Sequence, residues 1–141
     1  MNFIDTHTHL FLNQFKDDID DVIDIAIRSG ITKMFLPNIN SETTDSMLQL
    51  CEKYPGNCFS MMGLHPCDVK KETMEKELLH VEEMLEKEKF IAVGEIGLDL
   101  YWDKTTLEIQ KMAFEFQIKL AKKHKLPIVI HVRDSFLEAI E

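Results

Sequence analysis

The order of secondary structure along this sequence is the feature that most restricts its fold. Five short apolar runs rich in β-forming residues alternate with longer stretches in which apolar residues recur at helical spacing. Such alternation is typical of an α/β fold with parallel strands, right-handed crossovers and outer helices. The strands are expected at residues 3–4, 31–36, 58–62, 90–93 and 127–132.

The length of one strand–helix unit leaves two architectures open. The first and fifth runs begin near Phe3 and Pro127, so one unit takes about 31 residues. Eight such units would need roughly 250 residues, the usual size of a closed eight-stranded barrel. The 141 residues present have room for five strands and part of a fifth helix. On these grounds the chain is either a five-stranded open sheet or the first half of a barrel.

The composition is that of one ordinary domain, with 45% hydrophobic and 29% charged residues. No run of about 18 apolar residues and no secretory signal is present, so we expect no membrane partner. The three cysteines, Cys51, Cys58 and Cys67, have no metal-like spacing and predict reduced thiols in a cytoplasmic protein. The net charge of −9 argues against a broad phosphate-binding surface. A nucleic acid would have to be held locally, by metal ions or a few cations.

A pair of histidines follows the first apolar run. Asp5, His7 and His9 are spaced by two residues, and on a strand such residues face the same side. In parallel α/β folds the carboxyl ends of the strands carry the site. Two imidazoles that converge there can hold one divalent ion. The alternative is a pair of exposed loop histidines, because an isolated H-x-H is common.

Three other strand ends also carry polar side chains and favour the metal interpretation. His65 follows the third run, Glu95 and Asp99 follow the fourth, and His131 and Arg133 end the fifth. Histidines with a purely structural role would be scattered along strands and helices. A carboxylate at the rim of a buried strand is costly unless it is compensated. Glu95 is therefore expected either to bind metal, bridging two ions with its two oxygens, or to pair with a Lys or Arg.

These motifs resemble those of the TatD-type deoxyribonucleases, a branch of the metal-dependent hydrolases built on the (β/α)8 TIM barrel. The resemblance lies in "FIDTHTHL" (3–10), "GLHP" (63–66), "GEIGLDLYWD" (94–103), Gln110, Phe114 and Gln117 in "QKMAFEFQIKLA", and "LPIVIHVRDS" (126–135). They occur in family order and at family-like spacing. The resemblance implies that residues 1–141 form a single, incomplete domain, the N-terminal part of the barrel with about five βα units.

The resemblance also implies a set of metal ligands. In that family the H-x-H pair binds one divalent ion, the Glu after the fourth strand bridges two ions, and the His after the fifth strand binds the second. The corresponding residues here are His7, His9, Glu95 and His131. The later half of the family's chains supplies a further metal-binding His and Asp, which cannot lie in this chain.

Four other residues complete the predicted site, in which Glu95 is also the central catalytic residue. His65 and Arg133 are candidates to contact the scissile phosphate, since both stand beside the ligands and Arg can bind phosphate in bidentate fashion. Asp5 is expected either to orient a ligand histidine or to cap the strand end. Asp99 is expected either to accept a hydrogen bond from a ligand or to shape the turn.

The implied activity is hydrolysis of phosphodiester bonds of DNA, exonucleolytic on single-stranded ends, by a water activated by two divalent ions. The ligand types admit Mg²⁺, Mn²⁺ or Zn²⁺. Two alternatives stay open at this point. One is a hydrolase of the same superfamily that acts on an ester or amide. The other is a truncated chain, inactive alone and stable only through self-association or with the missing C-terminal half.

Overall fold

The computed structural model describes residues 2–140, and its strands are all parallel. β1, β2 and β3 pair in sequence order, β4 pairs with β5, and a single parallel bridge between Met62 and Val93 connects the two groups. The strands are β1 (Phe3–Asp5), β2 (Ile31–Pro37), β3 (Cys58–Met61), β4 (Val93–Asp99) and β5 (Ile128–Arg133). The predicted parallel arrangement is therefore present in the described part of the chain.

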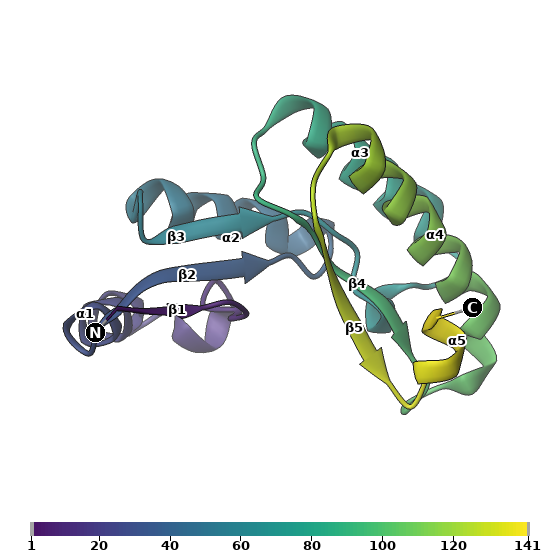
Figure 1. The fold of residues 1–141 in the computed structure, drawn as a ribbon, viewed down its shortest axis with the longest axis horizontal. Coiled ribbons are helices and arrows are strands. Elements are labelled where there is room, and N and C mark those ends of the chain that lie inside the picture. The colour runs from purple at the N-terminus through teal and green to yellow at the C-terminus, as the bar shows by residue number, and fades with distance from the viewer. Residues whose placement is uncertain (1, 141) are drawn as a thin grey trace.

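A helix follows each strand. They are α1 (Ile19–Arg28), α2 (Ser41–Lys53), α3 (Met74–Lys87), α4 (Leu107–His124) and α5 (Phe136–Ile140), with short 3-10 turns η1 (Asn13–Phe15), η2 (Pro66–Asp68) and η3 (Lys104–Thr106). α3 and α4 lie side by side, and α4 packs against β4 (Figure 1). Among residues 2–140, no helix is long and apolar enough to cross a membrane.

Local signals explain where the helices begin and end. The Asn40 side chain accepts hydrogen bonds from the backbone N–H groups of Glu42 and Thr43 and so caps the start of α2. α1 ends just before Gly30, whose φ of 95° is accessible to glycine at little cost. Because each helix follows a strand, the helix N-termini lie near the carboxyl ends of the strands, the edge where the histidines lie.

The core forms between the helices and one face of the strands. The first four helices bury apolar residues of their predicted stripes, for example Ile23, Met47, Val81 and Ala113, whereas Met112 on α4 is exposed. The edges are not covered in the same way. Apolar side chains stay exposed on β1, β5 and α5: Phe3, Ile4, Ile130, Val132, Phe136, Leu137 and Ile140. Phe35 on β2, in contrast, is only partly exposed.

The fourth strand differs from the prediction. It was expected at residues 90–93 but spans Val93–Asp99, so Glu95 and Asp99 lie within the strand and not after it. The apolar pattern failed here because every residue of β4 is buried, including the two carboxylates, which have polar partners. Gly97 lets β4 approach β5 closely. Its φ is 142°, and a Cβ there would lie 2.1 Å from the carbonyl oxygen of His131.

Candidate metal centre

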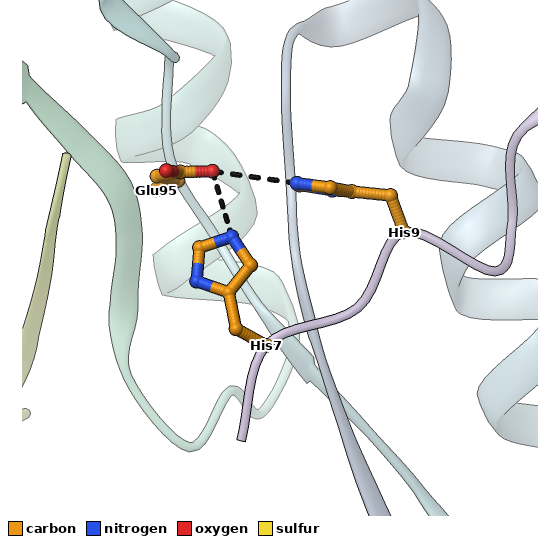
Figure 2. A group of neighbouring side chains, drawn as sticks. All are labelled: His7, His9 and Glu95. Atoms are coloured by element: carbon orange, nitrogen blue, oxygen red, sulfur yellow. Dashed lines mark hydrogen bonds and ion pairs between the residues drawn. The ribbon is translucent and has the colours of Figure 1, made fainter. Parts of the chain in front are cut away.

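Two histidine rings near the N-terminus contact one carboxylate oxygen of Glu95. Nε2 of His7 lies 2.9 Å and Nε2 of His9 lies 3.3 Å from Oε2 of Glu95. Figure 2 shows both rings directed at this oxygen. β1 ends at Asp5, so the two histidines lie on the segment just beyond the strand. The structure thus brings together three of the residues that the sequence selected, from the carboxyl end of β1 and from β4.

The backbone fixes which nitrogen of His9 faces the carboxylate. Nδ1 of His9 lies 3.0 Å from the carbonyl oxygen of Pro37, which can only accept, so Nδ1 carries the proton. A neutral His9 then directs the lone pair of Nε2 at the carboxylate. That contact is favourable only if the ring is protonated or a cation lies between the two groups. The donor set therefore fits a divalent cation.

A second group meets the other oxygen of Glu95. Nδ1 of His131 lies 2.9 Å from Oε1 of Glu95, and Nε2 of His131 lies 2.8 Å from Oδ2 of Asp99. The two hydrogen bonds raise the pKa of His131, that to Glu95 most strongly, against the opposing effect of burial. A histidine held by a carboxylate through one nitrogen has its other nitrogen oriented for a metal ion.

His65 lies beside this second group and faces it as a hydrogen-bond donor. Its Nδ1 accepts a hydrogen bond from the backbone N–H of Cys67, and burial lowers its pKa, so the neutral ring carries its proton on Nε2. That nitrogen lies 3.2 Å from Nδ1 of His131 and 3.8 Å from Oε2 of Glu95. As a neutral donor, His65 is suited to hydrogen-bond an anion at the centre.

Two groups of three side chains therefore share Glu95. The first comprises His7, His9 and Glu95, the second comprises His65, Glu95 and His131, and in each one nitrogen or oxygen atom per residue lies within 4.8 Å of the others. Burial alone would raise the pKa of Glu95. Interactions with the surrounding histidine rings, that with His131 first, outweigh burial, so the pKa of Glu95 falls well below its usual range. Glu95 is thus a carboxylate at neutral pH and can face two cations at once.

The two aspartates contact the histidines in different ways. Oδ1 of Asp5 accepts a hydrogen bond from the backbone N–H of His7 at 3.1 Å, so it holds the chain and not the ring. Asp99 both contacts a ligand histidine and shapes the turn, the two roles predicted as alternatives. Its Oδ2 contacts the ring of His131, and its Oδ1 accepts from the backbone N–H of Tyr101 at 3.0 Å.

Arg133 does not point into the cluster. Its guanidinium carbon lies 3.6 Å from the centre of the Tyr101 ring and 5.5 Å from that of Trp102. Within residues 2–140 it forms no ion pair with a carboxylate of the centre. The expected contact between Arg133 and a phosphate remains a proposal and would have to be made from this stacked position.

Two glutamines on α4 support the site, and sequence reasoning assigned a role to neither. The side-chain amide of Gln117 binds both backbone groups of Leu64, at 2.7 and 3.2 Å. The amide of Gln110 binds both backbone groups of Asp99, at 2.8 and 3.0 Å. Both side chains are buried. The sequence signal that could have identified them is two amide side chains, seven residues apart, on the otherwise apolar face of a helix.

The fold and the cluster together describe an α/β chain with a candidate metal centre at the carboxyl ends of parallel strands, as is typical of metal-dependent hydrolases. The family model described as "TatD related DNase" matches residues 4–141. The chain belongs to this family, as its motifs predicted.

Individual relatives agree. The chain is 37% identical over 131 residues to the "Uncharacterized metal-dependent hydrolase YabD" of Bacillus subtilis, covering 93% of this chain and 51% of that protein. It is 31% identical over 131 residues to the "3'-5' ssDNA/RNA exonuclease TatD" of Salmonella typhimurium, covering 93% and 50%. The crystal structure of YjjV, a TatD homologue from Escherichia coli K12, matches with a TM-score of 0.89 at 34% identity, over 97% of this chain and 53% of that one.

The chain spans about half the length of the relatives it matches. The predicted fold class, parallel strands and outer helices corresponding to part of a (β/α)8 barrel, is confirmed by the structural match.

Proposed function

We propose that this chain forms part of a nuclease that hydrolyses phosphodiester bonds of DNA at single-stranded ends, using divalent cations bound at the Glu95 cluster. The observation that carries the proposal is the position of Glu95, whose Oε2 faces His7 and His9 while its Oε1 faces His131. The name of the Salmonella relative, an exonuclease for single-stranded DNA and RNA, supports the substrate class.

His7, His9 and Glu95 would hold one cation, and Glu95 with His131 would contribute to a second. A divalent cation there supplies Lewis-acid polarisation of a phosphoryl oxygen and lowers the pKa of water. Mixed imidazole and carboxylate ligands suit Mn²⁺ and Zn²⁺ and also admit Mg²⁺. We propose that ligands from outside residues 1–141 complete both sites.

The other side chains have distinct tasks in this proposal. Asp99 keeps the proton on Nε2 of His131, so that Nδ1 stays directed at the centre. His65 donates a hydrogen bond from Nε2 to a phosphoryl oxygen. Because its ring is neutral, it adds no positive charge to the site. Asp5 fixes the backbone of His7. Arg133, extended over Tyr101, would donate to a phosphate at the rim of the site.

We further propose that residues 1–141 are one incomplete domain whose open edges, β1 and β5, pair with the remaining βα units or with a second copy. The exposed apolar residues on both edge strands support this. Cys51, Cys58 and Cys67 are free thiols, in keeping with a cytoplasmic location.

The test uses the natural full-length protein with labelled single-stranded DNA, duplex DNA, and a panel of ester and amide substrates, in Mg²⁺, Mn²⁺, Zn²⁺ or chelator. We expect metal-dependent shortening of single strands, and a loss of at least about 100-fold in Glu95→Gln. Glu115→Gln is the matched control, because the Glu115 side chain is 70% exposed on α4. Preferential cleavage of an ester or amide would assign the alternative hydrolase activity.

A further inference from the structure

Two large aromatic side chains stand in solvent directly after β4. Trp102, the only tryptophan of the sequence, is 73% exposed, and Tyr101 is 52% exposed. Their rings meet edge to face, with centroids 4.7 Å apart and an interplanar angle of 89°. A tryptophan exposed to this extent is unusual, because its large apolar surface favours burial or a ligand.

Arg133 holds this pair from the neighbouring strand. Its guanidinium stacks on Tyr101, and its carbonyl oxygen accepts a hydrogen bond from the backbone N–H of Leu100 at 2.9 Å. Tyr101, Trp102 and Arg133 therefore form one surface, called here the aromatic platform. Stacked aromatic and guanidinium planes, with Arg donors at the rim, are the surfaces on which proteins bind nucleobases.

The platform is connected to the candidate metal centre through Asp99. One oxygen of this carboxylate accepts from the backbone N–H of Tyr101, and the other contacts Nε2 of His131. Asp99 and Trp102 also line one cavity of about 280 Å³, together with Pro66, Cys67, Val69, Lys70, Asp103, Thr106 and Gln110. A ligand group that enters this cavity lies between the platform and the segment that carries His65.

The charge of the chain makes a stacking contact useful. The net charge of −9 argues against a broad basic surface that would attract a phosphate backbone. Stacking on an aromatic ring adds affinity that does not depend on charge and tolerates every base, because each base has a π-face. Such a contact suits an enzyme that takes single strands irrespective of their sequence.

We propose that the aromatic platform is a nucleobase subsite, in which Trp102 stacks on the base next to the phosphate held at the Glu95 cluster. This inference rests on the proposed function for the position of the phosphate. It assigns Trp102 as the residue that discriminates single-stranded nucleic acid from other phosphodiesters. Tyr101 and Arg133 position the indole and cover one side of the subsite.

The first experiment measures binding, with no need for catalysis. The 141-residue chain is titrated with a short oligothymidylate and with an abasic oligomer of the same phosphate number, in chelator and in Mn²⁺. Because Trp102 is the only tryptophan, its fluorescence reports directly on stacking. We expect quenching by the oligothymidylate and none by the abasic oligomer. Absence of binding, or equal affinity for both oligomers, would overturn the proposal.

Variants then test the residue by anisotropy of a labelled oligothymidylate. Trp102→Ala should weaken binding roughly 5- to 100-fold, while Trp102→Phe retains most of the affinity. Neither should change the affinity for the abasic oligomer. Phe3→Ala is the control. Phe3 is also exposed, at 51%, but it lies at the amino end of β1, whereas the candidate metal centre lies beyond the carboxyl end. Binding by Trp102→Ala equal to that of the natural chain would refute the subsite.

The full-length protein separates this inference from the proposed function. If both stand, Trp102→Ala raises KM for the oligothymidylate and leaves cleavage of the abasic oligomer unchanged. If the protein cleaves phosphodiesters but Trp102→Ala has no effect on KM, the subsite is wrong and the proposed function holds. If the chain shows Trp102-dependent binding without any metal-dependent cleavage, the subsite holds and the proposed function is wrong.

Discussion

Oε2 of Glu95 lies 2.9 Å from Nε2 of His7, although 88 residues separate them and β2 and β3 stand between their strands. In a flat sheet, two strands so placed would be about 14 Å apart at the strand spacing of about 4.8 Å. The contact therefore requires the sheet to curve, so that the carboxyl ends of β1 and β4 approach each other across its concave side. This curvature matches the barrel of the structural relative.

Removal of the two rings should separate metal binding from folding. We expect His7→Ala with His9→Ala to abolish metal-dependent hydrolysis in the full-length protein and to change the free energy of unfolding by less than about 1 kcal/mol, because both residues lie at the rim. Activity assays, metal titration and circular dichroism check this. A lost fold, or unchanged metal affinity, would contradict the assignment.

Substitution of Gly97 should break the contact between β4 and β5. A Cβ in Gly97→Ala would meet the backbone oxygen of His131 at 2.1 Å, so we expect a loss of more than about 3 kcal/mol or no soluble protein. Gly56→Ala is the control. Gly56 also has a positive φ, of 85°, but nothing lies within 4 Å of the position that a Cβ would take there, so only about 1–2 kcal/mol should be lost. Urea denaturation compares the two, and equal losses would exclude a steric cause.

Gln117 should be required for stability, because its side-chain amide forms hydrogen bonds with the backbone of Leu64, next to His65. Gln117→Leu keeps the approximate size but leaves the buried N–H and C=O of Leu64 without their partner. We expect a loss of about 2–4 kcal/mol in the free energy of unfolding. Gln49→Leu, at an exposed position of α2, should change stability by less than about 0.5 kcal/mol. A stable Gln117→Leu chain with full metal affinity would show that the amide is dispensable.

The open edges should cause association of the 141-residue chain in isolation. Ile130 and Val132 on β5 are 48% and 41% exposed, and an uncovered apolar edge strand favours pairing with another chain. Light scattering after size-exclusion chromatography should show a mass above that of a monomer that rises with concentration. Ile130→Lys should shift the chain towards monomer. A monomer at high concentration that also binds two ions tightly would contradict an incomplete domain.

The sequence by itself determined the order and direction of the elements and the set of residues at the strand ends. Helical stripes such as that of α1 and short β-rich runs such as that of β2 are local patterns, readable because burial repeats with the period of each element. The spacing of two between His7 and His9 likewise placed both at one strand end. The resemblance of the motifs identified the family, which the family match over residues 4–141 confirmed.

Only the tertiary structure decided which of these residues meet. The extent of β4 was misjudged because its buried carboxylates, Glu95 and Asp99, are compensated by histidines distant in sequence, which no local pattern reveals. The stacking of Arg133 on Tyr101 and the binding of Leu64 by Gln117 depend in the same way on the approach of separate elements. Local periodicity records which face of an element is buried. The curvature of the sheet and the register of its strands decide which side chains share a site.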